Sequence, residues 1–207
     1  MRIIDGLNLP GWRVEIPDCS RNDLPEFFKD LGLRVGAEIG VWKARFSEVL
    51  CRGGLEVYAI DQWQEDPDCV LYGTQEMIDK AYSDAMKRLH PYIKAGTCHI
   101  IRKASMEAVK DFADGSLDWV YIDGNHSFAY VAQDVFFWSK KVRKGGVIAG
   151  HDYIVIKAKN PFFLNVKEVI DAYTRAVRIP KWYVLGEKHP QPGHKRDKER
   201  SWMWIKE

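Results

Sequence analysis

Acidic and imidazole side chains stand at the ends of two apolar segments of the sequence. The segment LDWVYIDGNHS ends an apolar run at Asp123 and places His126 just before a predicted helix, and the segment GGVIAGHDY ends near His151 and Asp152. Carboxylate oxygens bind hard cations such as Mg²⁺, and a histidine with an ordinary pKa of about 6.5 can take up a proton at neutral pH. These residues either form a reactive site or only cap a turn and a helix.

The elements that would position these residues alternate between strands and helices. Apolar runs predict strands at 34–40, 56–61, 98–103, 117–123, 145–153, 182–187 and 201–207. Apolar residues three and four positions apart predict helices at 22–32, 44–51, 75–89, 105–113, 128–142 and 166–177. The helix at 75–89 is expected to end before Pro91, and Ser105 is a candidate to cap the helix at 105–113.

This order of elements predicts one α/β domain. Five strands that alternate with helices favour a mostly parallel sheet covered on both faces. Only the loop KHPQPGHKRDKER separates the last two strands, so we expect an antiparallel hairpin that makes the sheet mixed. We therefore predict a Rossmann-like three-layer sandwich with a seven-stranded sheet over residues 1–207, in which residues 1–33 form an N-terminal extension with a short helix.

The composition limits the partners of the protein. Hydrophobic residues make up 46% of the chain and charged residues 29%, and the formal net charge is only +2, so no strong field attracts nucleic acid or a membrane. No apolar run approaches the roughly 18 residues of a membrane span or forms the core of a signal peptide. The four cysteines form no Cys-x-x-Cys pair. We expect a cytoplasmic protein with reduced thiols and a small-molecule partner, as a monomer or a homo-oligomer.

The turn EIGVWKA after the first parallel strand is a candidate cofactor site, because ligands of such sheets bind at the carboxyl ends of the strands. It holds Gly40 alone instead of the pattern G-x-G-x-x-G, which disfavours a pyrophosphate. A carboxylate would still be attracted to the N-terminus of the following helix. Asp61, at the end of the next strand, could accept two hydrogen bonds from a ribose diol. The alternative is a tight turn followed by a strand-end cap.

Together these residues resemble the class I S-adenosylmethionine-dependent methyltransferases. Glu38 and Gly40 match the first motif of that family, and Asp61 matches the second. The run from LDWVYIDGNH to GHDY is similar to the subgroup of macrocin and mycinamicin sugar O-methyltransferases, which pairs Asp-x-x-His with an acidic residue after the fifth strand. The resemblance covers about residues 34–153. Trp42 and Ala44 depart from it, because they replace glycines that are common in the first motif.

The resemblance implies a set of cofactor contacts. Glu38 would contact the amino-acid end of S-adenosylmethionine, Asp61 the ribose, and Ser105 with Met106 the adenine. The full set of implied cofactor-binding residues is Glu38, Gly40, Trp42, Asp61, Gln62, Ser105, Met106 and Asp123. Trp63, in the loop after Asp61, is a candidate for a lid or a sugar-stacking surface, whereas Trp138, Trp202 and Trp204 are expected in the core.

The resemblance also implies a reactive rim. In this topology the strands ending at Asp123 and His151 are neighbours, about 4.8 Å apart, so Asp123, His126, His151 and Asp152 should converge beside the sulfonium. His126 or His151 would be the catalytic base. Asp123, His151 and Asp152 would bind Mg²⁺ or another divalent metal. Position 151 is histidine where metal-dependent relatives commonly have an acid, and either histidine could instead only pack or touch the cofactor.

The predicted function is O-methylation of a small hydroxylated acceptor, with a sugar or a glycosylated metabolite as the leading candidate. Two alternatives remain open at this point. One is an NAD-binding oxidoreductase of Rossmann type, which the missing glycines disfavour. The other is a protein that binds a nucleoside cofactor without catalysis.

Overall fold

The computed structural model describes residues 1–65, 73–155 and 165–207. The strands are β1 (Arg13–Ile16), β2 (Val35–Ile39), β3 (Glu56–Asp61), β4 (Cys98–Arg102), β5 (Leu117–Ile122), β6 (Val142–Gly150), β7 (Trp182–Leu185) and β8 (Trp202–Ile205). The helices are α1 (Ile3–Gly6), α2 (Leu24–Asp30), α3 (Arg45–Arg52), α4 (Gln75–Lys94), α5 (Ser105–Ala108), α6 (Phe128–Lys141) and α7 (Val166–Ala176). A 3₁₀ turn, Arg21–Asp23, precedes α2, and another, Val109–Asp111, follows α5.

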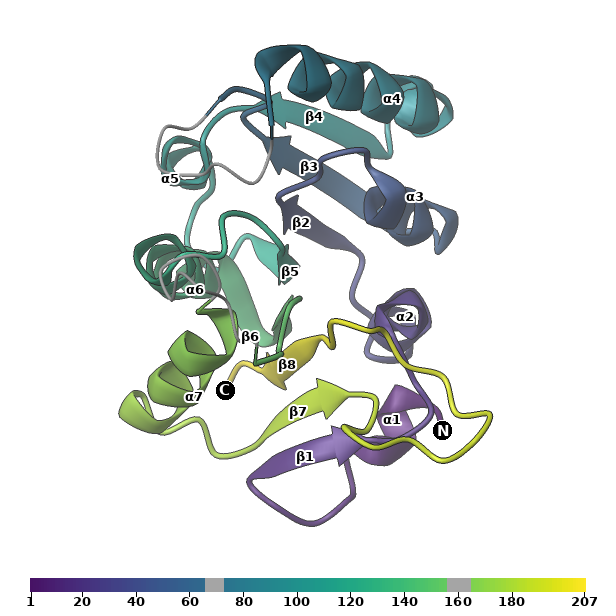
Figure 1. Ribbon diagram of the computed structural model, residues 1–207, viewed down its shortest axis with the longest axis vertical. Coiled ribbons are helices and arrows are strands. Elements are labelled where there is room, and N and C mark those ends of the chain that lie inside the picture. The colour runs from purple at the N-terminus through teal and green to yellow at the C-terminus, as the bar shows by residue number, and fades with distance from the viewer. Residues whose placement is uncertain (66–72, 156–164) are drawn as a thin grey trace.

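The described strands form one mixed sheet in the order β1-β7-β8-β6-β5-β2-β3-β4 (Figure 1). β8 runs antiparallel to β6 and β7, while the other pairs are parallel. The predicted mostly parallel sheet with a C-terminal antiparallel hairpin is confirmed. The sheet has eight strands instead of the predicted seven, because β1 in the N-terminal extension pairs with β7 and buries Val14 and Ile16.

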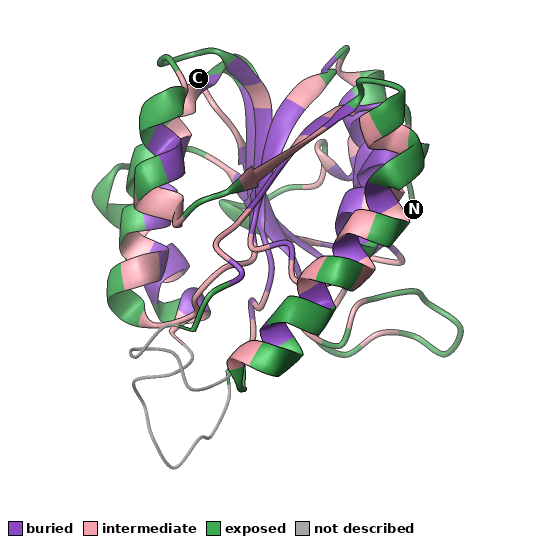
Figure 2. Ribbon diagram, turned by 90° about the horizontal axis from the view of Figure 1, so that it is seen from above, coloured by how far each residue is buried: buried purple, intermediate pink, exposed green. Residues whose placement is uncertain are grey.

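Helices cover both faces of the sheet, as Figure 2 shows from above. Residues of α1, α2, α3 and α4 share one core with one face, and those of α5, α6 and α7 share a second core with the other face. The predicted three-layer sandwich is therefore confirmed. Trp138, Trp202 and Trp204 lie in the second core, as expected. None of the helices in the described ranges is long and apolar enough to cross a bilayer.

Several helix ends differ from the predicted ones. α5 ends at Ala108, and a 3₁₀ turn, Val109–Asp111, follows it where the helix was expected to reach residue 113. α4 continues through Pro91 to Lys94. Proline cannot donate a backbone hydrogen bond, but Tyr92 and Ile93 pack against the core and hold the last turn. α6 stops at Lys141, and Val142 begins β6 instead of ending the helix.

Ser105 does not cap α5, so this expectation is wrong. Ala104 occupies the N-cap position. The Ser105 hydroxyl instead donates a hydrogen bond to the Asp134 carboxylate and accepts one of 2.8 Å from the Trp138 indole N–H. A buried carboxylate needs a donor, and Ser105 supplies it.

Trp63 is a core residue, so the expected lid or sugar-stacking role is wrong for this side chain. Only 1% of its surface is exposed. Its indole N–H donates to the Trp42 carbonyl oxygen at 2.9 Å, and its ring packs on Tyr82 with 5.0 Å between the centroids. Residues 66–72 of the same loop lie outside the described residues.

Cys19, Cys51 and Cys98 are buried free thiols. The fourth cysteine, Cys69, lies outside the described residues. The described thiols therefore agree with the expected reduced state.

Gly40 brings the carboxyl ends of β2 and β5 together. Its φ of +86° lies in the left-handed region, and a Cβ at this position would stand 2.1 Å from the carbonyl oxygen of Asp123. Beside this contact, the backbone N–H of Asp123 donates a hydrogen bond of 2.7 Å to the carbonyl oxygen of Ile39, the residue before Gly40. Only glycine satisfies both the left-handed φ and this contact.

We predict that Gly40→Ala destabilises the protein far more than Gly54→Ala. Gly54 has a similar φ of +81° but has open space where its Cβ would stand. Gly54→Ala, the control, should lower the free energy of unfolding by only about 1 kcal/mol, the cost of a left-handed alanine. Gly40→Ala should lower it by at least about 2 kcal/mol more, because its Cβ clashes with Asp123. Urea unfolding measures both values. Equal losses in the two variants would contradict the close contact with Asp123.

Candidate functional site

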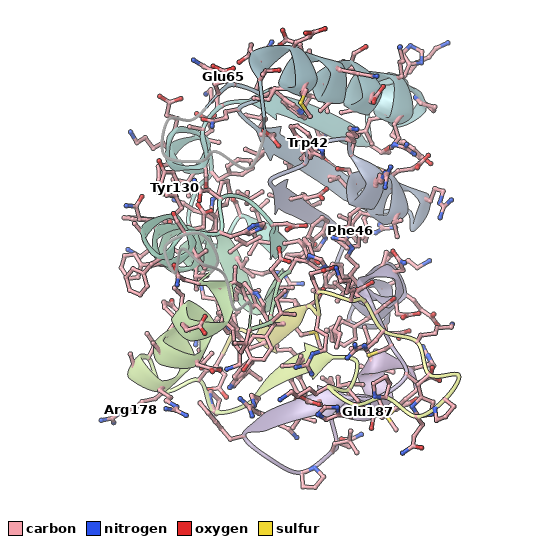
Figure 3. The ribbon with its side chains drawn as sticks, viewed as in Figure 1. Trp42, Phe46, Glu65, Tyr130, Arg178 and Glu187 are labelled. Carbon is pink, nitrogen blue, oxygen red and sulfur yellow. The ribbon has the colours of Figure 1, made fainter. Side chains whose placement is uncertain are left out.

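Two hollows adjoin at the carboxyl rim of the sheet. The first is narrow, about 90 Å³, and its lining includes Asp61, Gln62, Ser105, Tyr130 and Asp134. The second is wider, about 410 Å³, and its lining includes Arg21, Glu38, Phe46, Asp123 and His126. Gly40 and Trp42 line both hollows, so the turn after β2 joins them. In Figure 3, Tyr130 lies on the α5 and α6 side of the sheet, whereas Trp42 and Phe46 lie toward α3.

Asp61 caps the turn after β2. One carboxylate oxygen accepts hydrogen bonds from the N–H groups of Val41, at 2.9 Å, and Trp42, at 2.8 Å, and the other accepts one of 2.9 Å from the N–H of Trp63. Burial raises the pKa of Asp61, and these N–H groups oppose the rise. The Gln62 N–H makes a fourth hydrogen bond to Asp61, and a carboxylate has about four acceptor positions, so backbone groups occupy nearly all of them. The structure therefore contains the predicted cap and leaves limited room for the diol.

Glu38 lies at the end of β2 and faces the second hollow. It is 2% exposed and accepts a hydrogen bond from the Ser47 hydroxyl. Burial raises the pKa of Glu38 to about 8, and the Ser47 hydrogen bond opposes this rise. At neutral pH the side chain is therefore mostly a carboxylic acid, which can both donate and accept hydrogen bonds.

Asp134 is a lining residue that the sequence interpretation missed. It lies on the buried face of α6, is 4% exposed, and lines the first hollow beside Ser105. Burial raises the pKa of Asp134 to about 7, against the hydrogen bond from Ser105. The signal in the sequence is an acidic residue on the helix face of Val131, Val135 and Trp138. Met106, expected at the adenine, packs against the second core and does not line the first hollow.

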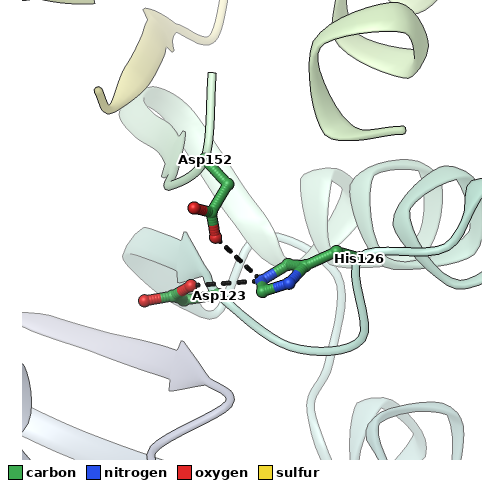
Figure 4. A group of neighbouring side chains, drawn as sticks. All are labelled: Asp123, His126 and Asp152. Atoms are coloured by element: carbon green, nitrogen blue, oxygen red, sulfur yellow. Dashed lines mark hydrogen bonds and ion pairs between the residues drawn. The ribbon is translucent and has the colours of Figure 1, made fainter. Parts of the chain in front are cut away.

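Asp123, His126 and Asp152 form a tight cluster (Figure 4). The His126 Nε2 atom lies 3.4 Å from an Asp123 oxygen and 2.9 Å from an Asp152 oxygen. One ligand atom from each residue lies within 4.8 Å of the others. The His151 Nδ1 atom lies 3.8 Å and 3.6 Å from the same two carboxylates. The four side chains expected at this rim are thus gathered there.

Local geometry explains the cluster. Asp123 directly follows β5, His126 precedes α6, and Asp152 follows β6. β5 and β6 are parallel neighbours with Ile122 opposite Gly150, so the residues after both strands leave the sheet side by side. Asp152 has a φ of +58°, in the left-handed region that aspartate tolerates better than most residues.

The two carboxylates determine the charge of His126. Burial lowers its pKa, but hydrogen bonds with Asp123 and Asp152 outweigh burial and raise the pKa to about 10. Conversely, burial raises the pKa of Asp152, and the two imidazoles outweigh burial and lower it. At neutral pH His126 is therefore an imidazolium ion between two carboxylates. The expectation of an ordinary His126 pKa is wrong for this arrangement.

Arg21 is a second lining residue that sequence reasoning missed. Its Nη1 atom lies 3.1 Å from an Asp123 oxygen, and its guanidinium stands 5.2 Å above the centre of the Phe46 ring. It comes from the 3₁₀ turn before α2, and 102 residues separate it from Asp123. Neither a motif nor a periodicity marks it in the sequence.

The sequence matches a family of methyltransferase domains. Residues 33–153, more than half of the chain, match the family described as Methyltransferase domain. The uncharacterized protein y4gI of Sinorhizobium fredii (strain NBRC 101917 / NGR234) is 28% identical over 122 residues, which are 58% of this chain but only 13% of that relative. The chain thus spans a small part of the length of this curated relative.

Three solved structures share the fold. The O-methyltransferase TomG from Streptomyces achromogenes, in complex with SAM, is 14% identical, with a TM-score of 0.61 over 90% of this chain and 79% of that chain. An O-methyltransferase from Bacillus cereus in complex with SAH is 16% identical, with a TM-score of 0.59 over 99% and 87%. An rRNA methylase from Streptococcus thermophilus is 12% identical, with a TM-score of 0.59 over 88% and 93%. At these identities the likeness shows the fold alone.

We predict that Asp134→Asn makes stability less dependent on pH. Because burial raises the pKa of Asp134 from 3.8 to about 7, the folded protein keeps a proton that the unfolded chain releases, and the free energy of unfolding falls as pH rises through this range. Asparagine still accepts the Ser105 hydrogen bond but cannot titrate. The downward slope should become less steep by up to about 1.4 kcal/mol per pH unit. Denaturant unfolding at several pH values measures it, and identical slopes would exclude a raised pKa.

Proposed function

This chain belongs to the methyltransferase domain family, and we propose that it transfers the methyl group of S-adenosylmethionine to a hydroxyl oxygen of a small acceptor, such as a sugar or a glycosylated metabolite. The observation that carries the proposal is the cluster of Asp123, His126 and Asp152 beside the turn at Gly40 and Trp42. A methyl transfer to oxygen needs a donor held in line with the acceptor and a group that removes the acceptor's proton. The two adjoining hollows supply a place for each partner.

The cofactor occupies both hollows in this proposal. The narrow first hollow suits the flat adenine ring, with Ser105 and Asp134 on its wall and Asp61 with Gln62 near the ribose. The turn at Gly40 and Trp42 then leads the methionine part toward Glu38 in the second hollow. The SAM and SAH in the TomG and Bacillus cereus structures support the choice of this cofactor.

The carboxylates of Asp123 and Asp152 are suited to bind a divalent cation. The Asp123 and Asp152 carboxylates belong to one tight group of possible ligands, and carboxylate oxygens together with an imidazole nitrogen suit Mg²⁺ or Mn²⁺. The ligands expected from sequence are Asp123, His151 and Asp152. The His151 Nδ1 atom lies 3.8 Å from Asp123 and 3.6 Å from Asp152, so His151 could complete this set and leave His126 free to act as the base. A bound cation would lower the pKa of the acceptor hydroxyl and offset the two carboxylate charges.

His126 removes the acceptor proton in this proposal. It lines the second hollow, and Asp123 and Asp152 fix its ring. The same two carboxylates raise its pKa to about 10, so His126 acts as a base only when their charge is offset. His151, 9% exposed and bordering the same carboxylates, is the alternative base.

Positioning of the cofactor and the acceptor supplies the rest of the rate enhancement in this proposal. The methyl group of the sulfonium is already activated, and alignment of two reactants can contribute roughly 7 to 11 kcal/mol to a barrier. The rigid strand ends at Gly40 and Asp123 provide this alignment. An NAD-dependent oxidoreductase is the weaker candidate, because the turn holds Gly40 alone where pyrophosphate binding uses three glycines.

Two measurements test this function. Calorimetric titration should show binding of S-adenosylmethionine and no comparable binding of NAD. Single-turnover reactions with methyl-labelled cofactor should then transfer label to members of a library of sugars, glycosides and other hydroxylated acceptors. Tighter binding of NAD would support the oxidoreductase, and cofactor binding without any transfer would support the non-catalytic alternative.

We predict that His126→Ala lowers the single-turnover rate by roughly 10² to 10⁴, the usual contribution of a general base. The affinity for S-adenosylmethionine should stay within about three-fold, because the residue acts on the acceptor. His90→Ala is the matched control, since His90 is exposed on α4 away from both hollows. Parallel losses of rate and cofactor affinity in His126→Ala would remove the residue from the base role.

A further inference from the structure

We infer that Arg21 selects acceptors that carry an anionic group, a carboxylate or a phosphate, close to the hydroxyl that is methylated. This inference rests on the proposed function, because it names the acceptor class of the same site. The observation behind it is that the N-terminal extension, outside the matched residues 33–153, places a fixed guanidinium beside Asp123 in the second hollow.

The backbone at Arg21 is held in place on both sides. The preceding Ser20 forms a reciprocal capping arrangement with Asp23. The Arg21 N–H donates to an Asp197 oxygen at 2.8 Å, which ties the turn to the loop before β8. A guanidinium on such a support loses little freedom when it binds an anion.

The guanidinium has donors left for a ligand. Asp123 accepts one hydrogen bond at 3.1 Å, and the Tyr121 hydroxyl provides a second contact. Arginine has five N–H donors in a planar fork, and the Arg21 side chain is 27% exposed. The remaining donors can bind a carboxylate or a phosphate, which is the geometry that arginine recognises best.

The second hollow has more positive than negative charge on its wall. Its basic lining residues are Arg21, Lys43, Arg45 and His126, and its acidic lining residues are Glu38 and Asp123. Glu38 adds little negative charge at neutral pH, because burial raises its pKa to about 8. Unlike charges attract more strongly in a partly buried hollow than in water, so an anion gains free energy here.

The cofactor does not cancel this excess. S-adenosylmethionine has a sulfonium and an ammonium group against one carboxylate, so it adds positive charge. Lys43 and Arg45 follow Trp42 in the chain and line the same hollow, so they can offset its carboxylate. Arg21 lies against Asp123 and over the Phe46 ring. An acceptor near Asp123 therefore meets Arg21 and brings the missing negative charge.

Matched pairs of acceptors distinguish this role from simple support of Asp123. Suitable pairs are glucuronate with methyl glucoside, glucose 6-phosphate with glucose, and 3,4-dihydroxybenzoate with its amide. Single-turnover transfer is measured for both members of each pair with wild type, Arg21→Gln and Arg52→Gln. Arg52 is exposed at the end of α3 and is outside both hollows, so its variant controls for the lost charge.

The wild type should prefer the anionic member of a methylated pair by at least about ten-fold, as expected for a charged hydrogen bond. Arg21→Gln should reduce this ratio about ten-fold, and Arg52→Gln should leave it unchanged. An Arg21→Gln variant that slows both members equally, with the ratio preserved, would show that Arg21 only positions Asp123 and would overturn the inference.

Binding of inorganic phosphate to the SAH-loaded protein gives a second readout that needs no turnover. Arg21→Gln should weaken this binding at least about ten-fold relative to Arg52→Gln. Equal phosphate affinity in the two variants would overturn the inference even if an acceptor is found. Absence of methyl transfer together with Arg21-dependent phosphate binding would instead count against the proposed function and leave the anion site supported.

Discussion

The carboxylates of Asp123 and Asp152 stand at the ends of two neighbouring parallel strands, and positive charge must offset their mutual repulsion. In this structure the His126 imidazolium lies between them, 2.9 Å from Asp152 and 3.4 Å from Asp123, and Arg21 adds a contact of 3.1 Å to Asp123. A partly buried pair of like charges is costly without such partners. The composition of the rim, with its imidazole, guanidinium and candidate cation site, follows from this constraint.

The topology of the sheet brings the two carboxylates together. The parallel register that sets Ile122 opposite Gly150 directs both strand ends to one edge. Gly40 lets β2 approach that edge closely enough to bring the cofactor turn against the backbone of Asp123. The extra strand β1 forms the edge of the sheet beside β7, and the chain after it returns to the rim with Arg21. The fold thus delivers reactive groups from segments that are distant in sequence.

Much of the fold and part of the site could be predicted from sequence. The alternation of strands and helices, the hairpin and the three layers follow from local apolar spacing. Asp123 and His126 could be identified because they are close in sequence and end a strand. The parallel strands then bring His151 and Asp152 beside them. Gly40 could be identified because it is the glycine in the turn after the first predicted parallel strand.

Other parts could not be predicted, for reasons that differ from residue to residue. Arg21 acts through a contact across 102 positions, and a single arginine in a 3₁₀ turn has no periodic signal. The pKa of His126 depends on two carboxylates, so an isolated histidine value misjudges it. Trp63 lies in a polar loop but turns inward, because Asp61 holds its backbone N–H and the Trp42 carbonyl accepts its indole N–H. Asp134 was missed, although an acidic residue on an otherwise apolar helix face is a signal that could have identified it.

The central claim is that the cofactor turn at Gly40 and the carboxylates of Asp123 and Asp152 form one site. A crystal structure of the protein with SAH and Mn²⁺, with an anomalous difference map to locate the metal, tests this claim most directly. We expect the adenosine in the narrow hollow between Asp61 and Ser105, the sulfur beside Gly40, and an anomalous peak roughly 2.0 to 2.3 Å from carboxylate oxygens of Asp123 and Asp152. Nucleoside density away from the turn at Gly40, or Mn²⁺ bound apart from both carboxylates, would contradict the account.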